Sequence, residues 1–184
     1  MEIYTNPSVT LSLTDDGACA YETTTTLNGG TPAGGTYSGT GVSGSNFDAT
    51  VAGVGTHTIT YTITDGNGCT DSATDDIEVY ALPNVTLIIP NDQVCEDETI
   101  TLNSGSPAGG TYSGNGITGN QFDAATAGVG THTITYTYSD FNSCVSTATD
   151  DITVFPNPSI NNITENNATT CGVNNGSLSV DASG

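Results

Sequence analysis

Five cysteines are the residues of this chain whose type and spacing could support covalent chemistry. Cys19 and Cys69 lie 50 residues apart and Cys95 and Cys144 lie 49 apart, so two similar pairs follow each other along the chain. Cys171 is the fifth. Cysteines that recur at matching places are typical of structural disulfides in an oxidising compartment. The sequence therefore predicts covalent cross-links in an extracellular protein.

Oxygen-bearing side chains form a second candidate group, around one hairpin expected in each half of the chain. Its members are Asp65, Asn67, Asp71, Asp140 and Asn142. Oxygen-rich loops can hold calcium, and calcium at a junction between modules would stiffen an array. The spacing matches neither an EF-hand nor a calcium-binding nonapeptide repeat, so a solvated acidic face is the alternative. Calcium is the one cofactor that the sequence suggests.

The two histidines, His57 and His132, stand beside isoleucine and tyrosine with no cysteine or second histidine nearby in sequence. We expect each to bond to backbone at a corner of the fold. Serine is abundant, but no nucleophile elbow of the form Gly-x-Ser-x-Gly accompanies it. The glycine runs that begin at Gly34 and Gly109 lack the lysine of a phosphate-binding loop. The sequence therefore predicts a protein that is not an enzyme.

The segments that carry these residues occur twice. Residues 32–80 and 107–155 align at an offset of 75, with 33 of 49 positions identical. Residues 2–11 match residues 78–87, while Pro158 and Cys171 correspond to Pro83 and Cys95. Self-similarity at such a period is the mark of a repeat array. We expect the end of a preceding module at 1–5, modules at 6–81 and 82–156, and the start of a truncated third at 157–184.

The charge of the chain limits its partners. It has no lysine or arginine and 20 acidic residues, for a net charge of −20. Nucleic acid and anionic lipid surfaces would repel it. No run of about 18 apolar residues appears, so we expect no membrane insertion.

Short strands separated by glycine turns account for the repeat. Residues 56–65 (THTITYTITD) alternate strictly, which places isoleucine and tyrosine on one face and threonine on the other. Further strands are expected at 8–13, 23–27, 35–38 and 73–79. Several short strands per module with frequent turns predict an all-β chain of tandem immunoglobulin-like β-sandwich modules.

This fold leaves two ways to pair the cysteines. Pairing within modules joins Cys19 to Cys69 and Cys95 to Cys144. In the expected topology, however, Cys19 and Cys69 lie in loops at opposite ends of the sandwich, about 23 Å apart, whereas bonded cysteines need Cα atoms within about 7 Å. Pairing across modules joins Cys19 to Cys144. It leaves Cys69 for a preceding module and Cys95 for a following one, and this is the pairing that the strand positions favour.

Residues 52–79 (AGVGTHTITYTITDGNGCTDSATDDIEV) are similar to the last two strands of polycystic-kidney-disease-type immunoglobulin-like repeats. The chain as a whole resembles repeats of giant cell-surface adhesins of Bacteroidota. Its end (TTCGVNNGSLSVDASG) is similar to a repeat of their gliding-motility adhesins. The resemblance implies type IX secretion and display at the cell surface. The triplet Asp71-Ser72-Ala73 resembles an O-glycosylation acceptor of that phylum, which implies sugar on Ser72.

Two functions remain open. The first is a stalk or fibre segment of a large secreted surface adhesin, whose partners are neighbouring modules and whose surface or polysaccharide ligand binds elsewhere in the full protein. The second is a carbohydrate-binding or spacer module of a secreted polysaccharide-degrading enzyme. Sugar platforms use exposed aromatic rings, and the chain has no tryptophan and only 8 tyrosines and 4 phenylalanines. The composition favours the stalk.

Overall fold

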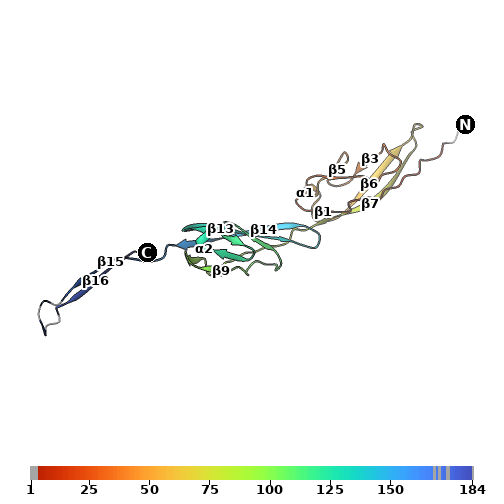
Figure 1. The fold of residues 1–184 in the computed structure, drawn as a ribbon. Helices are drawn as coiled ribbons and strands as arrows, with labels where there is room; N and C mark the ends of the chain where they lie inside the picture. Colours follow the sequence, from red (N-terminus) through yellow and green to blue (C-terminus); the bar gives the residue numbers. More distant parts are fainter. Residues whose placement is uncertain (1–3, 168, 170, 173–174, 184) are drawn as a thin grey trace. The chain divides into compact units, whose positions relative to one another are not determined.

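A computed structural model describes residues 4–167, 169, 171–172 and 175–183. In that part of the chain, strands joined by turns make up nearly all the regular structure, and two helices of four residues each are the exceptions (Figure 1). The expectation of an all-β fold is confirmed. Neither of these helices is long and apolar enough to cross a membrane.

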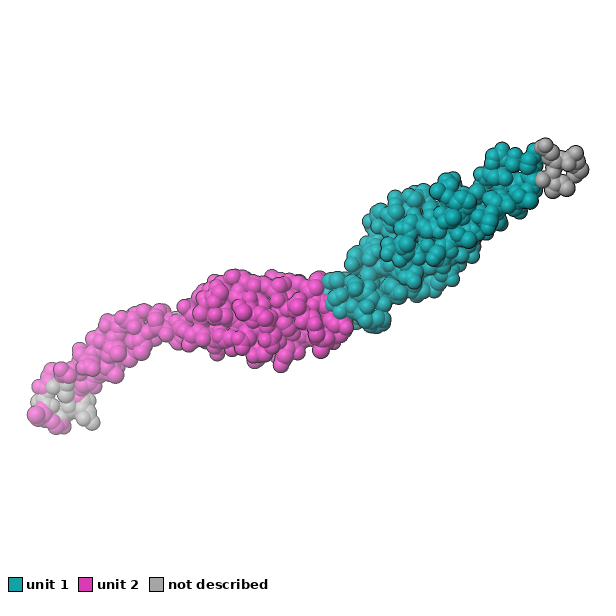
Figure 2. Space-filling view, turned by 45° about the vertical axis from the view of Figure 1, so that its right-hand side comes forward, with its two compact units in different colours: residues 1–84, 139–146 teal, residues 85–138, 147–184 magenta. Residues whose placement is uncertain are grey.

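The chain divides into two compact units (Figure 2). Unit 1 comprises residues 1–84 together with the short segment 139–146, and unit 2 comprises residues 85–138 and 147–184. The module boundaries expected from the sequence, at 81–82 and 156–157, stay predictions. The expected remnant of a preceding module at 1–5 lies partly outside the described residues, because these begin at Tyr4.

The first repeat is a sandwich of two sheets. One has the strand order β1-β7-β6-β3 and the other β2-β5-β4. The strands are β1 (Gly17–Cys19), β2 (Thr25–Thr26), β3 (Thr36–Ser38), β4 (Val42–Ser43), β5 (Asn46–Phe47), β6 (Gly55–Thr64) and β7 (Thr70–Tyr80), with helix α1 (Ala49–Ala52) after β5. This division of seven strands is that of an immunoglobulin-like sandwich, with the first strand paired in parallel to the last.

The second repeat has the same plan. Its sheets have the orders β10-β13-β14-β8 and β11-β12-β9. The elements are β8 (Gln93–Cys95), β9 (Thr99–Thr101), β10 (Thr111–Ser113), β11 (Ile117–Thr118), β12 (Gln121–Asp123), α2 (Ala124–Ala127), β13 (Gly130–Ser139) and β14 (Val145–Phe155). An antiparallel hairpin, β15 (Ser159–Asn166) and β16 (Ser177–Ser183), follows.

The alternation of β6 builds the core of the first repeat. Ile59, Tyr61 and Ile63 are buried, whereas the threonines between them point outward. Ile59 packs in one cluster with Phe47 of the other sheet and Ile77 of β7. Ile134, Phe122 and Ile152 form the matching cluster of the second repeat. Because β-strand side chains alternate between faces, one apolar stripe per strand is enough to hold two sheets together.

The segment at residues 8–13 is the main departure from the expected strands. It makes one isolated bridge, from Thr10 to Thr31, and no regular ladder. The N–H of Leu13 instead donates to the carboxylate of Asp75 at 2.8 Å. The N–H of Ser12 still donates to the carbonyl of Gly29 at 3.3 Å, so the side-chain acceptor replaces a backbone partner at Leu13 alone. The first regular strand is β1, so Cys19 is the last residue of that strand and does not lie in a loop after it.

Candidate functional site

The only disulfide among the described residues joins Cys19 to Cys144, which are 125 positions apart in sequence. Their Cα atoms lie 5.5 Å apart, and both side chains are buried. Cys144 belongs to the segment 139–146, so the bond lies within unit 1. It nevertheless links the two sequence repeats, because Cys144 is part of the connection between β13 and β14. This is the pairing across modules that the strand positions favoured.

The pairing within modules is wrong, since Cys69 and Cys95 are free. The register of the first sheet gives the reason. Cys19 lies opposite Tyr80, the last residue of β7, whereas Cys69 immediately precedes the first residue of that strand. A strand of 11 residues therefore separates them, which corresponds to about 35 Å. A disulfide cannot span this distance.

The hairpin that presents Cys144 is shaped by Asp140. The carboxylate of Asp140 accepts hydrogen bonds from the backbone N–H groups of Asn142 and Cys144, each at 2.9 Å. The N–H of Asp140 donates to the carbonyl of Cys144 at 3.1 Å. Ser143 between them has a φ of 65°, in the left-handed region. Short side chains such as aspartate stabilise turns in this way, so Asp140 fixes the position of Cys144.

The hairpin of the first repeat has the same construction around Asp65. Its carboxylate accepts from the N–H groups of Asn67 at 2.9 Å and Cys69 at 2.8 Å. Gly68, with a φ of 84°, occupies the position of Ser143. Glycine adopts this left-handed conformation without strain, so the turn of the first repeat has less backbone strain than the turn that contains Ser143.

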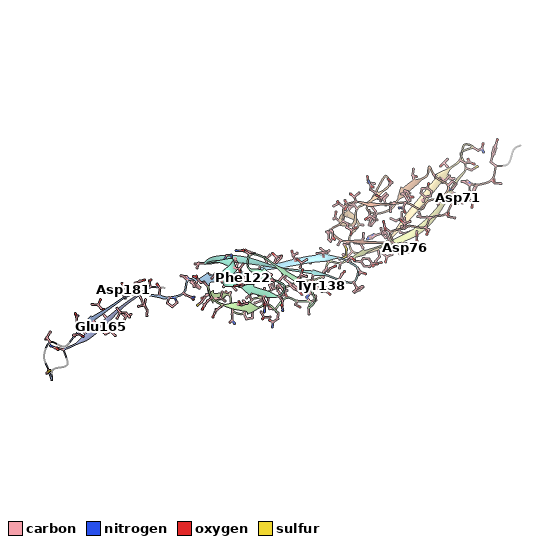
Figure 3. The ribbon with its side chains drawn as sticks, in the orientation of Figure 1. Asp71, Asp76, Phe122, Tyr138, Glu165 and Asp181 are labelled. Atoms are coloured by element: carbon pink, nitrogen blue, oxygen red, sulfur yellow. A yellow bond between two sulfur atoms is a disulfide. The ribbon has the colours of Figure 1, made fainter. Side chains whose placement is uncertain are left out.

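These contacts give a structural role to residues that we had considered for calcium. Asp65 and Asp140 cap hairpins, and Asn67 and Asn142 supply two of the N–H groups that they cap. Asp71 lies at the start of β7 (Figure 3). Its carboxylate accepts from the N–H of Ser72 at 2.9 Å. Within the described ranges, no group of three or more histidine, cysteine, aspartate or glutamate side chains could hold a metal ion. Calcium binding stays a prediction.

The paired acids of the last strands have structural roles that the sequence analysis did not assign. Asp75 accepts from the N–H of Leu13, and Asp150 accepts from the N–H of Ile89 at 2.7 Å. The next residue, Asp76, accepts from the hydroxyl of Thr58 at 2.8 Å on the outer face. The signal was present in the identical run Ala-Thr-Asp-Asp-Ile of both repeats. One acid of each pair fixes an incoming segment, and the other joins neighbouring strands.

The histidines have the structural role that was expected. Nε2 of His57 lies 2.7 Å from the carbonyl oxygen of Gly53, and Nε2 of His132 lies 2.7 Å from that of Gly128. The ring of His57 also packs beside Phe47, with 6.1 Å between ring centroids. Each histidine thus closes the bend between the short helix and the following strand.

Tyrosine hydroxyls fix the glycine runs. The hydroxyl of Tyr61 donates to the carbonyl of Pro32 at 2.7 Å and accepts from the N–H of Gly35 at 2.7 Å. A Cβ atom on Gly35 would come within 2.6 Å of the carbonyl oxygen of Thr62, so only glycine fits. Tyr136 makes the same contacts with Pro107 and Gly110. These glycines are packing positions at a strand edge.

Asp48 and Asp123 cap the short helices. A hydrogen bond from the side chain of Thr50 lowers the pKa of Asp48 below its ordinary value of 3.8, and the backbone N–H groups of Thr50 and Val51 act in the same direction. The side chain of Thr126 lowers the pKa of Asp123 in the same way. Hydrogen bonds to a carboxylate favour its charged form.

Ser72, the candidate glycosylation site, is exposed on the outer face of β7, opposite Thr62 of β6. Its hydroxyl-bearing neighbours on this face include Thr60, which pairs with Thr74. Glycosylation of Ser72 stays a prediction.

Comparisons with known proteins assign no family to this chain. No family model matches the chain, and no curated protein matches it. A solved structure described as a "Ca2+-stabilized adhesin" that "helps an Antarctic bacterium reach out and bind ice" is similar over 90% of this chain, at 20% sequence identity and a TM-score of 0.40. The chain spans about half of that protein, 53% of its length.

Proposed function

We propose that this chain is a structural segment, part of a stalk or fibre, of a large secreted bacterial surface adhesin. The observation that carries the proposal is the disulfide from Cys19 of the first repeat to Cys144 of the second. An enzyme or a sugar-binding module needs a shaped site on one domain. A segment that transmits tension needs resistance to unfolding along its length, and a bond that connects successive repeats supplies this.

The position of the bond determines the path of force through the chain. Tension applied at the two ends reaches Cys19 and Cys144 and passes between them through the sulfur atoms. The 125-residue stretch that the bond closes is then removed from the extensible chain. Most members of both core clusters lie within this stretch, whereas Ile152 and Val154 of β14 lie beyond it. The bond therefore protects most of the two cores, but not β14, when the flanking residues are pulled.

The composition supports a place outside the cell. Disulfides persist in oxidising compartments. The net charge of −20, without any basic residue, keeps exposed segments apart and soluble. Together with the likeness of the sequence to adhesin repeats of Bacteroidota, these features lead us to propose display at the cell surface after type IX secretion, as part of gliding-motility machinery or of another adhesive fibre.

The alternative of a carbohydrate-binding or spacer module in a polysaccharide-degrading enzyme has less support. Sugar platforms require aromatic rings that are exposed and free to stack. Tyr61 and Tyr136 are buried, and their hydroxyls are engaged by the glycine runs. Among the rings that are exposed, Tyr21 and Phe141 lie in turns and not on the flat face of a sheet. We therefore propose that ligand recognition lies elsewhere in the full protein.

Single-molecule pulling between the two ends tests the proposal. A chain extends by at most about 3.3–3.6 Å per residue, so the closed stretch of 125 residues hides about 400 Å of contour length. We expect the oxidised protein to release about 400 Å less than the reduced protein. Equal extension with and without reductant would show that the bond does not carry tension.

Cell labelling tests the location independently. An antibody against this chain should stain intact cells of the organism that produces it. Staining only after permeabilisation would contradict surface display. Retention on insoluble polysaccharides, measured with the same purified chain, would favour the alternative module.

A further inference from the structure

We propose that Cys69 and Cys95 are the two halves of a second junction like that of Cys19 and Cys144, and that this chain joins a second copy of itself head to tail through a Cys69–Cys95 disulfide. Cys95 corresponds to Cys19, and Cys69 corresponds to Cys144. Because Cys19 bonds to Cys144, the corresponding partner of Cys95 is Cys69.

The strand end that carries Cys95 has the same backbone as the strand end that carries Cys19. Cys19 lies opposite Tyr80 in a parallel pair, and Cys95 lies opposite Phe155 in a parallel pair. The turn after each is closed alike: the N–H of Glu22 donates to the carbonyl of Cys19 at 2.8 Å, and the N–H of Glu98 donates to that of Cys95 at 3.1 Å.

The hairpin that carries Cys69 also matches its bonded counterpart. In both hairpins an aspartate carboxylate accepts from the cysteine N–H, at 2.8 Å for Cys69 and 2.9 Å for Cys144. In both, the aspartate N–H donates to the cysteine carbonyl, at 2.9 Å in the first repeat and 3.1 Å in the second. The Cys69 hairpin therefore holds the bonded shape without a disulfide.

Burial distinguishes the used positions from the unused ones. Cys19 and Cys144 are 4% and 0% exposed. Cys69 and Cys95 are both partly exposed and free. Cys69 and Cys95 thus have the backbone geometry of the bonded pair but are not buried. A second copy of this chain supplies the partner cysteine to each and buries it.

The bond forms by thiol–disulfide exchange with a small disulfide such as oxidised glutathione. The Cys95 thiolate attacks it, forms a mixed disulfide and releases one glutathione. The Cys69 thiolate of the second copy then attacks the Cys95 sulfur and releases the other. Two thiols lose two protons and two electrons, and glutathione disulfide gains them. Because each copy carries a charge of −20, salt should speed the reaction by screening the repulsion.

The test uses three proteins that all lack the exposed Cys171, which could cross-link at random. The first is Cys171→Ser, the second adds Cys69→Ser, and the third adds Cys95→Ser. Each is oxidised in a glutathione buffer at about 0.5 M salt, where the screening length is only a few ångströms. Non-reducing electrophoresis then separates the products.

We expect Cys171→Ser to form a ladder of covalent multimers. Each of the other two proteins should stay almost entirely monomeric when it is oxidised alone. When the two are mixed, they should form about ten times more dimer than either gives by itself. The dimer has twice the mass of the 18.6 kDa chain. Trypsin has no site in this protein, so cleavage at acidic residues and mass spectrometry identify the Cys69–Cys95 peptide.

Other products would overturn the proposal. As much dimer from each protein alone as from the mixture would show unselective oxidation of exposed thiols. A Cys69–Cys95 bond within a monomer would equally refute head-to-tail joining. So would thiols that stay free in the mixture, once the buried Cys19–Cys144 bond has been verified in both proteins.

Discussion

Cys19 and Cys144 lie 5.5 Å apart at their Cα atoms although 125 positions separate them in sequence. Cys19 ends the first strand of its repeat, and Cys144 is the last residue before β14. Each is thus fixed by a sheet on one side and by a turn on the other. The bond closes most of the chain into one loop, and the stability of that loop is the first quantity to measure.

Replacing both bonded cysteines, Cys19→Ser with Cys144→Ser, should lower the free energy of unfolding by about 2–5 kcal/mol. The loss arises because the bond restricts the unfolded chain, and the restriction grows with loop length. Denaturant unfolding of oxidised protein measures it. The matched control is Cys171→Ser, which removes an exposed free thiol and should change stability by less than about 0.5 kcal/mol. Equal effects in both proteins would contradict the expectation.

Tyr61→Phe should destabilise the first repeat by about 1–3 kcal/mol. The variant keeps the ring but leaves the Pro32 carbonyl and the Gly35 N–H without their shared partner. Thermal unfolding followed by circular dichroism measures the change. Tyr138→Phe is the control, since it changes a tyrosine of a core-facing strand for which no hydrogen bond is described. A loss as large in Tyr138→Phe would point to a general effect of the hydroxyl.

Asp75→Ala should cost about 1–2 kcal/mol, because the N–H of Leu13 then loses its acceptor next to the core. Asp76→Ala, one residue along the same strand, removes only an exposed contact with Thr58 and should cost less than about 0.5 kcal/mol. Hydrogen exchange at the Leu13 amide gives a site-specific reading and should speed up only in Asp75→Ala. An unchanged exchange rate at the Leu13 amide in Asp75→Ala would show that Asp75 does not hold this segment in place.

Asp65→Asn separates the hairpin role of Asp65 from calcium binding. The amide oxygen can still accept from the N–H groups of Asn67 and Cys69, so we expect the melting temperature without calcium to change little, whereas Asp65→Ala should lower it. If calcium binds the folded form, it raises the melting temperature of the unaltered protein, and Asp65→Asn weakens that rise. An unchanged melting temperature with calcium and with chelator would eliminate this site.

Acid should weaken the caps of the short helices. The pKa values of Asp48 and Asp123 are lowered in the folded protein relative to their ordinary value of 3.8. The unfolded state therefore binds protons more readily, and stability falls as the pH drops through and below this value. Denaturant unfolding between about pH 2 and pH 6 should show the fall, and Asp48→Asn with Asp123→Asn should make it shallower. A pH profile identical to that of the unaltered protein would contradict this.

The repeat and its strands could be predicted because their signals are local. The alternation of residues 56–65 places Ile59 and Tyr61 on one face whatever their partners, and the structure confirms them as core residues. The role of His57 also followed from its immediate neighbours on that strand. Periodicity and composition therefore determined the fold class and the absence of long helices in the described chain.

The shortest elements escaped prediction because they depend on distant partners. Strand β1 has three residues and exists through its register with β7, some 60 positions away. Nothing in the sequence around Asp75 identifies Leu13 as its partner, because only the fold brings the two residues together. The four-residue helix α1 is too short to show helical periodicity, and its cap Asp48 was the only local sign.

The cysteines show most clearly where sequence ends and tertiary structure begins. Spacing suited Cys19–Cys69, whereas the expected strand positions favoured Cys19–Cys144. The structure decided between them because the distance between two thiols depends on strand direction and on which turn reaches which sheet end. The sequence determined that repeating cysteines occur at matching places. Only the register of β1 on β7, together with the hairpin held by Asp140, decided which two of them meet.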